Sequence, residues 1–295
     1  MKRVFPLIVL ILGILASCTE DVIVDLEEGT PLIGVEGSFT DQYKRHQVKL
    51  TYSASFYDDF VEMVTGAHVA VTDSIDTIAF HEVPGRPGYY LTDSVAGKPN
   101  TQYRLLIDVP DVSQLGGYLH LYADSYMRYN VDAIDSIAMK PFQVMEDIHP
   151  GVSYSIYPYF QSLYDRSLVY LGMVYRNGRP VQTDVSELLT IPMGGYAGYY
   201  INGEEMTENN MEIPAGVIRS YMLREGDVVS LDLLSIPFDY MSYLYSLRTS
   251  VGNNPLMGSP SNLATNIYPK DKACGYFYTA AVVSASLVYH KSDYE

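Results

Sequence analysis

Cys18 is the residue whose surroundings most clearly predict a reaction. It ends the run Leu15-Ala16-Ser17-Cys18, in which a leucine and two small residues precede a thiol. Lipoprotein processing recognises this pattern: the thiol is acylated, and the chain is then cut in front of it. We therefore expect residues 1–17 to be a lipoprotein signal peptide and Cys18 to be the lipidated N-terminus of the mature chain. The alternative is a plain signal peptide that contains a cysteine by chance.

The other reactive residue types form no known catalytic signature. The sequence contains no G-x-S-x-G, H-E-x-x-H, phosphate-loop or EF-hand pattern. Its 6 histidines never stand at metal-ligand spacing, and nothing marks out a catalytic pair among its 35 acidic residues. We therefore expect no catalytic residue, no metal site and no cofactor.

Tyrosine is the most unusual part of the composition, with 28 Tyr, 9 Phe and no Trp. Its ring combines an apolar face with a polar tip, which suits stacking on sugars or peptides. Residues 194–200 combine glycines with Tyr196, Tyr199 and Tyr200, so we expect these three tyrosines to contact a ligand. The alternative is that tyrosines serve sheet packing, and the lack of tryptophan weighs against a sugar-binding platform.

The segments around Cys18 predict export and anchoring. Lys2 and Arg3 precede an apolar run of about 13 residues, which is too short to span a bilayer core that needs about 20. No later stretch is long and apolar enough either. Several acyl chains on one residue anchor a protein stably. Residues 18–30 carry clustered Asp and Glu, and we interpret them as an acidic tether behind the lipid.

The charge of the chain excludes one class of partner. The net charge is −16, and it becomes −18 when Lys2 and Arg3 leave with the signal peptide. Phosphate backbones require lysine and arginine, so this balance argues strongly against nucleic acid as a partner.

Short alternating segments separated by turns predict a mainly β fold. In the first part of the chain they recur at roughly 10-residue spacing, which is typical of an immunoglobulin-like antiparallel β-sandwich over residues 31–125. Residues 126–295 predict a second, mostly β domain in which Asn177-Gly178 marks a hairpin turn. Its one short helix is expected at about residues 237–250. The apolar stripe of that helix is Tyr240, Tyr243, Leu244 and Leu247.

Several short motifs resemble a Bacteroidota outer-membrane lipoprotein family known as domain of unknown function 4249. They are Asn254-Pro255-Leu256, Pro260-Ser261-Asn262, Thr265-Asn266-Ile267, Gly275-Tyr276-Phe277, Gly66-Ala67-His68-Val69-Ala70-Val71 and Gly88-Tyr89-Tyr90. The resemblance implies an outer-membrane lipoprotein that assists nutrient uptake, because such proteins are often encoded beside TonB-dependent receptors. It implies no activity, substrate or catalytic residue.

Two further resemblances concern sorting and modification. The acidic residues behind Cys18 resemble the signal that sends Bacteroidota lipoproteins to the cell surface, with the periplasmic face as the alternative. Bacteroidota also attach O-glycans where Asp precedes Ser or Thr and an aliphatic residue follows. The positions that fit this pattern are Ser74, Thr77, Ser94 and Ser136.

These observations favour a non-enzymatic lipoprotein that is accessory to a TonB-dependent transporter and binds an unidentified small molecule, peptide or glycan. One alternative is a fimbrial or adhesin-type structural subunit. However, the first basic residues of the mature chain are Lys44-Arg45, and cleavage there would remove the first expected strand. The other alternative is a hydrolase acting on glycans or peptides.

Overall fold

The computed structural model describes residues 31–53, 60–111, 117–143, 152–182, 184–204, 206, 212–252 and 263–294. The expected signal peptide, the acidic tether and the lipidated Cys18 lie outside these residues, and so do residues 254–262 of the family-like motifs. No helix in the described ranges has both the length and the apolar character that a membrane crossing requires.

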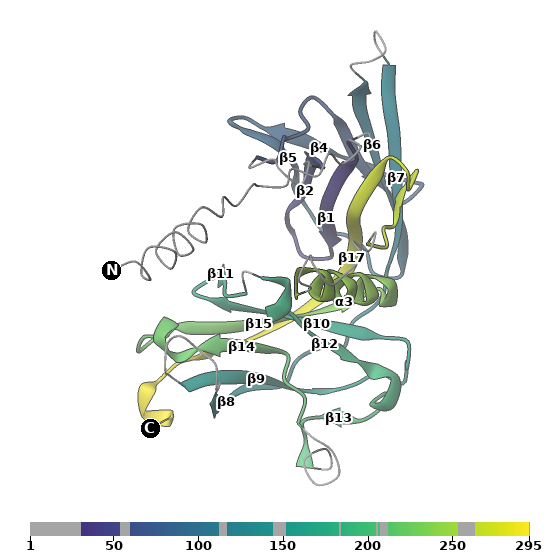
Figure 1. The fold of residues 1–295 in the computed structure, drawn as a ribbon. Helices are drawn as coiled ribbons and strands as arrows, with labels where there is room; N and C mark the ends of the chain where they lie inside the picture. Colours follow the sequence, from purple (N-terminus) through teal and green to yellow (C-terminus); the bar gives the residue numbers. More distant parts are fainter. Residues whose placement is uncertain are drawn as a thin grey trace, which may run out of the picture. The chain divides into compact units, whose positions relative to one another are not determined.

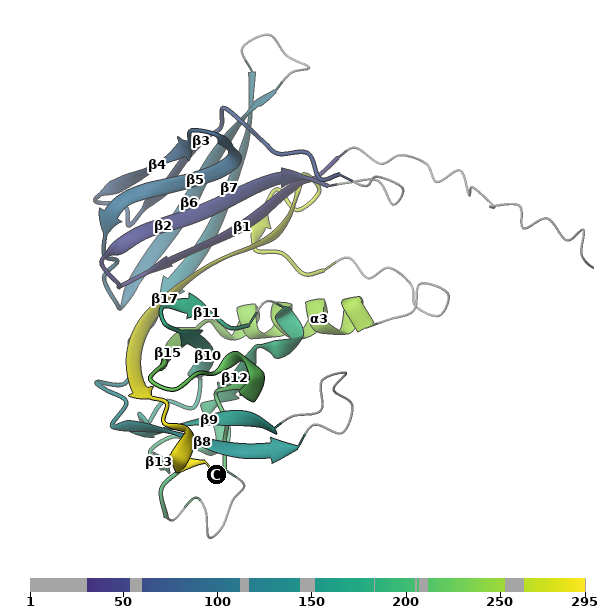
Figure 2. The same ribbon diagram turned by 90° about the vertical axis from the view of Figure 1, so that its left-hand side faces the viewer.

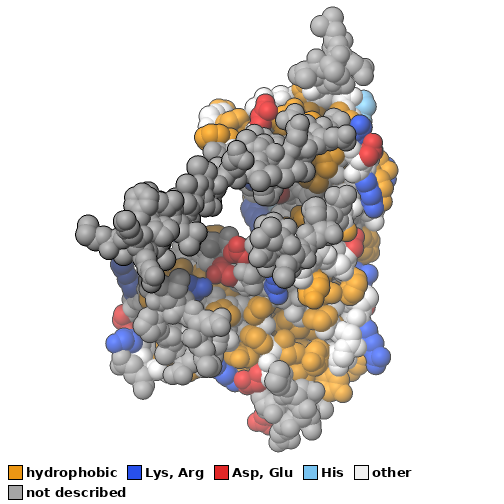
Figure 3. All heavy atoms as spheres, in the orientation of Figure 1, with side chains coloured by type: hydrophobic (Ala, Val, Ile, Leu, Met, Phe, Trp, Pro, Cys, Tyr) orange, Lys and Arg blue, Asp and Glu red, His pale blue; other side chains and the backbone are white. Residues whose placement is uncertain are grey.

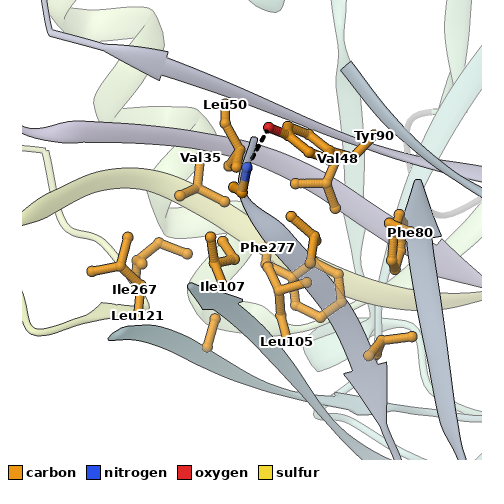
Figure 4. Close-up of a cluster of buried hydrophobic side chains, with 14 of the residues drawn as sticks. Val35, Val48, Leu50, Phe80, Tyr90, Leu105, Ile107, Leu121, Ile267 and Phe277 are labelled. Carbon is orange, nitrogen blue, oxygen red and sulfur yellow. Dashed lines mark hydrogen bonds between the residues drawn. The ribbon is translucent and has the colours of Figure 1, made fainter. Parts of the chain in front are cut away.

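The N-terminal part of the chain folds into an immunoglobulin-like β-sandwich (Figure 1). Its strands are β1 (Ile33–Thr40), β2 (Lys44–Tyr52), β3 (His68–Thr72), β4 (Thr77–Val83), β5 (Arg86–Val95), β6 (Thr101–Asp111) and β7 (Gly117–Met127). The order β1-β2-β5-β4 forms one layer, and the β3–β4 hairpin leads into the facing layer of β3, β6 and β7. Alternate side chains of both layers, such as Val35, Leu105 and Leu121, meet in one core (Figure 4). The expected fold class is confirmed.

The following part of the chain is also mostly β. Its strands are β8 (Ser136–Gln143), β9 (Val152–Gln161), β10 (Val169–Arg176), β11 (Arg179–Pro180), β12 (Leu189–Pro192), β13 (Tyr200–Ile201), β14 (Gly216–Arg219) and β15 (Val228–Ile236). Strands β8, β9, β13 and β14 form a four-stranded sheet, whose inner side chains share a core with those of β10 and β15. We call the strands β8 to β15 together the C-terminal lobe.

Helical turns complete the lobe. Short 3-10 helices are η1 (Val185–Glu187), η2 (Met193–Gly195), η3 (Ser220–Met222) and η4 (Lys291–Asp293). The helix α3 (Phe238–Gly252) confirms the helix expected at about residues 237–250. It lies between the sandwich and the C-terminal lobe (Figure 2).

The last strand, β17 (Ala273–Val288), joins the sandwich to the lobe and follows the short β16 (Ile267–Tyr268). Its first part pairs with β1, from Ile33↔Ala273 to Thr40↔Ala280. Its second part pairs with β15 from Ser235↔Ala281 onward, so one 13-stranded sheet runs through both regions. The β1–β17 pair is parallel, whereas the expected sandwich was antiparallel throughout.

The core of the sandwich contains residues from the far end of the chain. Ile267, Ala273 and Phe277 pack among the buried side chains of β1 to β7. A contiguous division into residues 31–125 and 126–295 assigns these three residues to the second domain, although their side chains complete the first core.

Polar side chains fix the point where β17 leaves the sandwich. Asn130 Nδ2 donates to the carbonyls of Leu233 and Ala281, at 2.7 and 2.8 Å, and so bridges β15 and β17. On β17 itself, the Val282 N–H donates to Asp41 Oδ1 at 2.9 Å. Because each contact joins distant parts of the chain, the path of β17 between the two regions is held by side chains as well as by the strand ladder.

The hairpin expected at Asn177-Gly178 is confirmed. Both residues have positive φ, 49° and 74°, and Arg176 pairs with Arg179 across the turn. Asp227 anchors this turn: it accepts hydrogen bonds from Arg176 Nε at 2.6 Å and Asn177 Nδ2 at 2.7 Å. These bonds lower the pKa of Asp227 to about 2, and the bond from Arg176 has the largest effect.

We expect the Asp227→Asn variant to be less stable than the wild type at pH 7, and we expect this difference in stability to disappear in acid. The lowered pKa means that the Asp227 carboxylate stabilises the fold above about pH 4, the pKa of aspartate in an unfolded chain. That contribution disappears as pH falls from about 4 toward 2. The melting temperature of the variant should therefore be lower than that of the wild type at pH 7, with the gap closing toward pH 2.

Thermal unfolding at pH 7, 5, 4, 3 and 2 measures this gap. Asp132→Asn, at an exposed position, is the control and should show little difference from the wild type at any pH. A gap for Asp227→Asn that is the same at pH 7 and pH 2 would contradict the prediction.

Candidate ligand-binding site

Two tyrosines of β17 face away from the core of the sandwich. Tyr276 and Tyr278 are two residues apart, so they lie on one face of the strand, while Phe277 between them points into the core. The parallel pairing with β1 places Glu36 beside Tyr276 and Ser38 beside Tyr278. One face of the β1–β17 pair therefore carries aromatic rings together with a carboxylate and a hydroxyl.

Helix α3 covers this face with its predicted stripe. Tyr240, Tyr243, Leu244 and Leu247 recur at helical spacing and lie on one side of the helix. Leu244 is buried among Val169, Leu171 and Ile236, which holds the helix to the sheet of the lobe. The stripe expected from the sequence therefore packs against the sheet and also faces β17.

The four tyrosines form one cluster around Tyr240. Its ring stacks on that of Tyr278 at a centroid distance of 4.0 Å and an interplanar angle of 17°. The ring of Tyr276 lies 5.1 Å from Tyr240 and 5.0 Å from Tyr243. These separations are those of favourable aromatic pairs, so the four rings pack together as one wall.

A cavity of about 600 Å³ opens beside this cluster, and we call it the tyrosine cavity. Its apolar lining comes from Tyr240, Tyr243, Tyr276, Tyr278, Leu244, Leu247, Met173, Val185 and Leu188. Its polar lining comes from Glu36, Ser38, Gln47, Gln182 and Asp184. An apolar surface with a few polar groups is the usual character of sites for small ligands.

The tyrosine hydroxyls of the cavity are neutral at pH 7, because the pKa of a phenol is about 10 and burial raises it further here. Burial, together with the neighbouring Tyr278, raises the pKa of Tyr240 well above its usual value. Burial and the negative charge of Glu36 raise the pKa of Tyr243. The cavity therefore presents neutral phenols that can donate hydrogen bonds.

The free thiol of Cys274 lies next to this site in the sequence. Burial raises its pKa, and a thiol with a raised pKa is a poor nucleophile.

Comparison with known proteins identifies the family. The model of a domain of unknown function, DUF4249, matches residues 19–286. The chain belongs to the DUF4249 family. No curated protein matches it.

One solved structure, the chicken CNTN1 FN1-FN3 domains, resembles this DUF4249 chain at 12% identity and a TM-score of 0.24. The alignment covers 72% of this chain and 64% of that structure, and so low a TM-score carries no argument about function.

The tyrosines expected to contact a ligand lie elsewhere in this DUF4249 chain. Tyr196 follows η2 and packs partly against the core of the lobe, while Tyr199 and Tyr200 are 42% and 37% exposed. Tyr200 Oη donates to Asp135 Oδ2 at 2.7 Å, which raises the pKa of Tyr200 to about 12. None of the three lines the tyrosine cavity, although hydrophobic side chains do gather on the lobe between α3 and β13 (Figure 3).

The expected modification sites are all on the surface. Ser74 lies in the turn between β3 and β4, Thr77 begins β4, Ser94 lies on β5, and Ser136 begins β8. All four are exposed, so a modifying enzyme could reach them, and their glycosylation stays a prediction. Within the described ranges, no group of three or more His, Cys, Asp or Glu side chains is placed to hold a metal ion.

Proposed function

We propose that this protein is a non-enzymatic, lipid-anchored outer-membrane protein that binds a ligand in the tyrosine cavity and is accessory to a TonB-dependent transporter. The tyrosine cavity carries the proposal, because it joins an apolar aromatic wall to polar groups in a space of about 600 Å³. That volume lies within the range of about 300–1,000 Å³ that is usual for ligand sites.

The construction of the cavity supports a binding role. Its walls come from β1 and β2 of the sandwich, from β10 and the residues at and beside η1 of the lobe, and from α3 and β17. Because β17 pairs with both β1 and β15, it joins the sheet walls of the site, and this connection supports a preorganised site. Preorganisation lowers the entropy cost of binding.

The sequence supports the anchor and the partner. The run Leu15-Ala16-Ser17-Cys18 supports lipidation, and the acidic residues that follow support a position at the cell surface. The resemblance to lipoproteins encoded beside TonB-dependent receptors supports the accessory role.

The ligand test compares two tryptophan variants of α3. Leu247→Trp fills the tyrosine cavity, whereas Tyr245→Trp changes a residue of the same helix that is 67% exposed and does not line it. Full-length lipidated proteins, purified from outer membranes in mild detergent, are analysed by native mass spectrometry for bound small molecules. We expect the wild type and Tyr245→Trp to retain a ligand that Leu247→Trp has lost. Equal retention by both variants would place the ligand elsewhere.

The partner test is affinity purification of the tagged, lipidated protein from outer membranes, with the recovered proteins identified by mass spectrometry. A stoichiometric TonB-dependent barrel is the expected result. Recovery of the protein alone, as ladders or filaments, would favour the fimbrial or adhesin-type subunit. Failure to recover a transporter even under nutrient limitation would contradict the accessory role.

A further inference from the structure

We infer that the tyrosine cavity selects a ligand whose apolar body carries a cationic amine or guanidinium group; this inference rests on the proposed function. The site combines aromatic walls with carboxylates, and among the lining residues that the structure describes there is no lysine, arginine or histidine.

The aromatic wall suits both parts of such a ligand. Tyr240, Tyr243 and Tyr276 present ring surface that can bury an apolar body. Tyrosine rings also attract cations where a ring face is accessible, because that face carries negative charge. One well-placed cation–ring contact corresponds to about a 2- to 30-fold gain in affinity.

The charged side chains among the described lining residues are all acidic. Glu36 and Asp184 line the cavity, and Asp239 lies close enough to Tyr276 that its negative charge helps raise the pKa of that phenol. An anionic ligand would lose its hydration among like charges without gaining a basic partner. A cationic ligand would meet lining carboxylates of opposite charge, Glu36 and Asp184.

The nearby cations do not reverse this sign. Lys49 Nζ lies 3.0 Å from Glu36 Oε1, so one carboxylate oxygen of Glu36 is directed toward a lysine outside the lining. Arg248 Nη2 donates to the carbonyl of Leu188, and Arg248 is not among the described lining residues. Among the described side chains of the lining itself, carboxylates therefore outnumber cations.

Three probes with one skeleton test the inference: tyramine, tyrosol and 4-hydroxyphenylacetate. They share a phenol ring and end in a cation, a neutral hydroxyl and an anion. Their affinities for the full-length protein are measured by saturation-transfer NMR and by calorimetry up to millimolar concentrations. We expect tyramine to bind more tightly than tyrosol by about 2- to 30-fold, and 4-hydroxyphenylacetate to bind most weakly.

Variants of the protein test whether the order of the three probe affinities depends on the cavity. Glu36→Gln removes one lining carboxylate and leaves Lys49 without it, so it should weaken tyramine and strengthen 4-hydroxyphenylacetate. Glu62→Gln, at an exposed position outside the lining, should leave the wild-type order unchanged. Leu247→Trp should abolish binding of all three probes.

Each remaining outcome overturns the inference. Equal affinities for the three probes, tighter binding of the anion, or no effect of Glu36→Gln would show that the lining charge does not select the ligand. If no probe binds, this ligand class is wrong, while the proposed function still stands or falls on the ligand retained in native mass spectrometry.

Discussion

Replacing Gly275 by alanine is expected to lower the free energy of unfolding by about 2–5 kcal/mol. Gly275 has a φ of +88°, a conformation that costs an L side chain about 1–2 kcal/mol. A Cβ at this position would also lie 2.1 Å from the carbonyl oxygen of Val35, which belongs to the backbone of β1. Backbone cannot move aside as a side chain can, so overpacking adds about 1–3 kcal/mol or more. Urea denaturation of the full-length protein measures the sum.

Gly226→Ala separates the two contributions. Gly226 has a similar φ of +82°, but a Cβ there would meet nothing within 4 Å. This control should cost only the backbone term of about 1–2 kcal/mol. If both variants lose the same stability, the close approach of β17 to β1 is not tight, and the expected result for Gly275 fails.

The position of Gly275 explains why the effect should also reach the cavity. The residue lies directly before Tyr276 and pairs with Val35, one residue before Glu36. A displacement of β17 from β1 would therefore move Tyr276 relative to Glu36. We expect Gly275→Ala to weaken tyramine binding even at temperatures where it remains folded.

Local structure could be predicted from the sequence because its causes are local. The stripe of Tyr240, Tyr243, Leu244 and Leu247 defines a helix face through spacing alone, and the helix was found at Phe238–Gly252. The Asn177-Gly178 turn depends on two adjacent residues that tolerate positive φ.

The cavity could not be predicted because it depends on pairing between distant segments. Glu36 and Tyr276 are 240 positions apart in the sequence, and only the parallel β1–β17 ladder makes them neighbours. No periodicity in either segment indicates that register. The sequence therefore pointed to Tyr196, Tyr199 and Tyr200, which are close together along the chain, rather than to tyrosines that the fold brings together.

The tyrosines of β7 lie outside the core. Alternation on β7 places Tyr118, Tyr122 and Tyr126 on the outer face of the sandwich, where each is about two-fifths exposed. Sheet packing in the core is thus no general explanation for the tyrosine content. Tyr122 stacks on Tyr268 at 5.4 Å, so packing between rings at the surface accounts for part of it.

Tyr240→Ala is expected to release α3 and to abolish ligand binding. Tyr240 contacts three other rings, and its closest partner, Tyr278, lies on β17 at 4.0 Å. Truncation of a fully buried large aromatic side chain costs about 3–5 kcal/mol. Because Tyr240 is half-buried, we expect the free energy of unfolding to fall by about 2–3 kcal/mol. Tyramine affinity should fall more than 10-fold, since the central ring of the wall is lost.

Hydrogen exchange followed by mass spectrometry distinguishes local release of the helix from general destabilisation. In Tyr240→Ala the amides of α3 should exchange faster while those of β1 and β2 keep their protection, because only the helix loses its contact with β17. Tyr245→Ala, on the exposed side of the same helix, should change stability by no more than about 0.5 kcal/mol and leave exchange unaltered. If Tyr240→Ala speeds exchange equally throughout the sandwich, Tyr240 supports the whole fold rather than the wall of the tyrosine cavity.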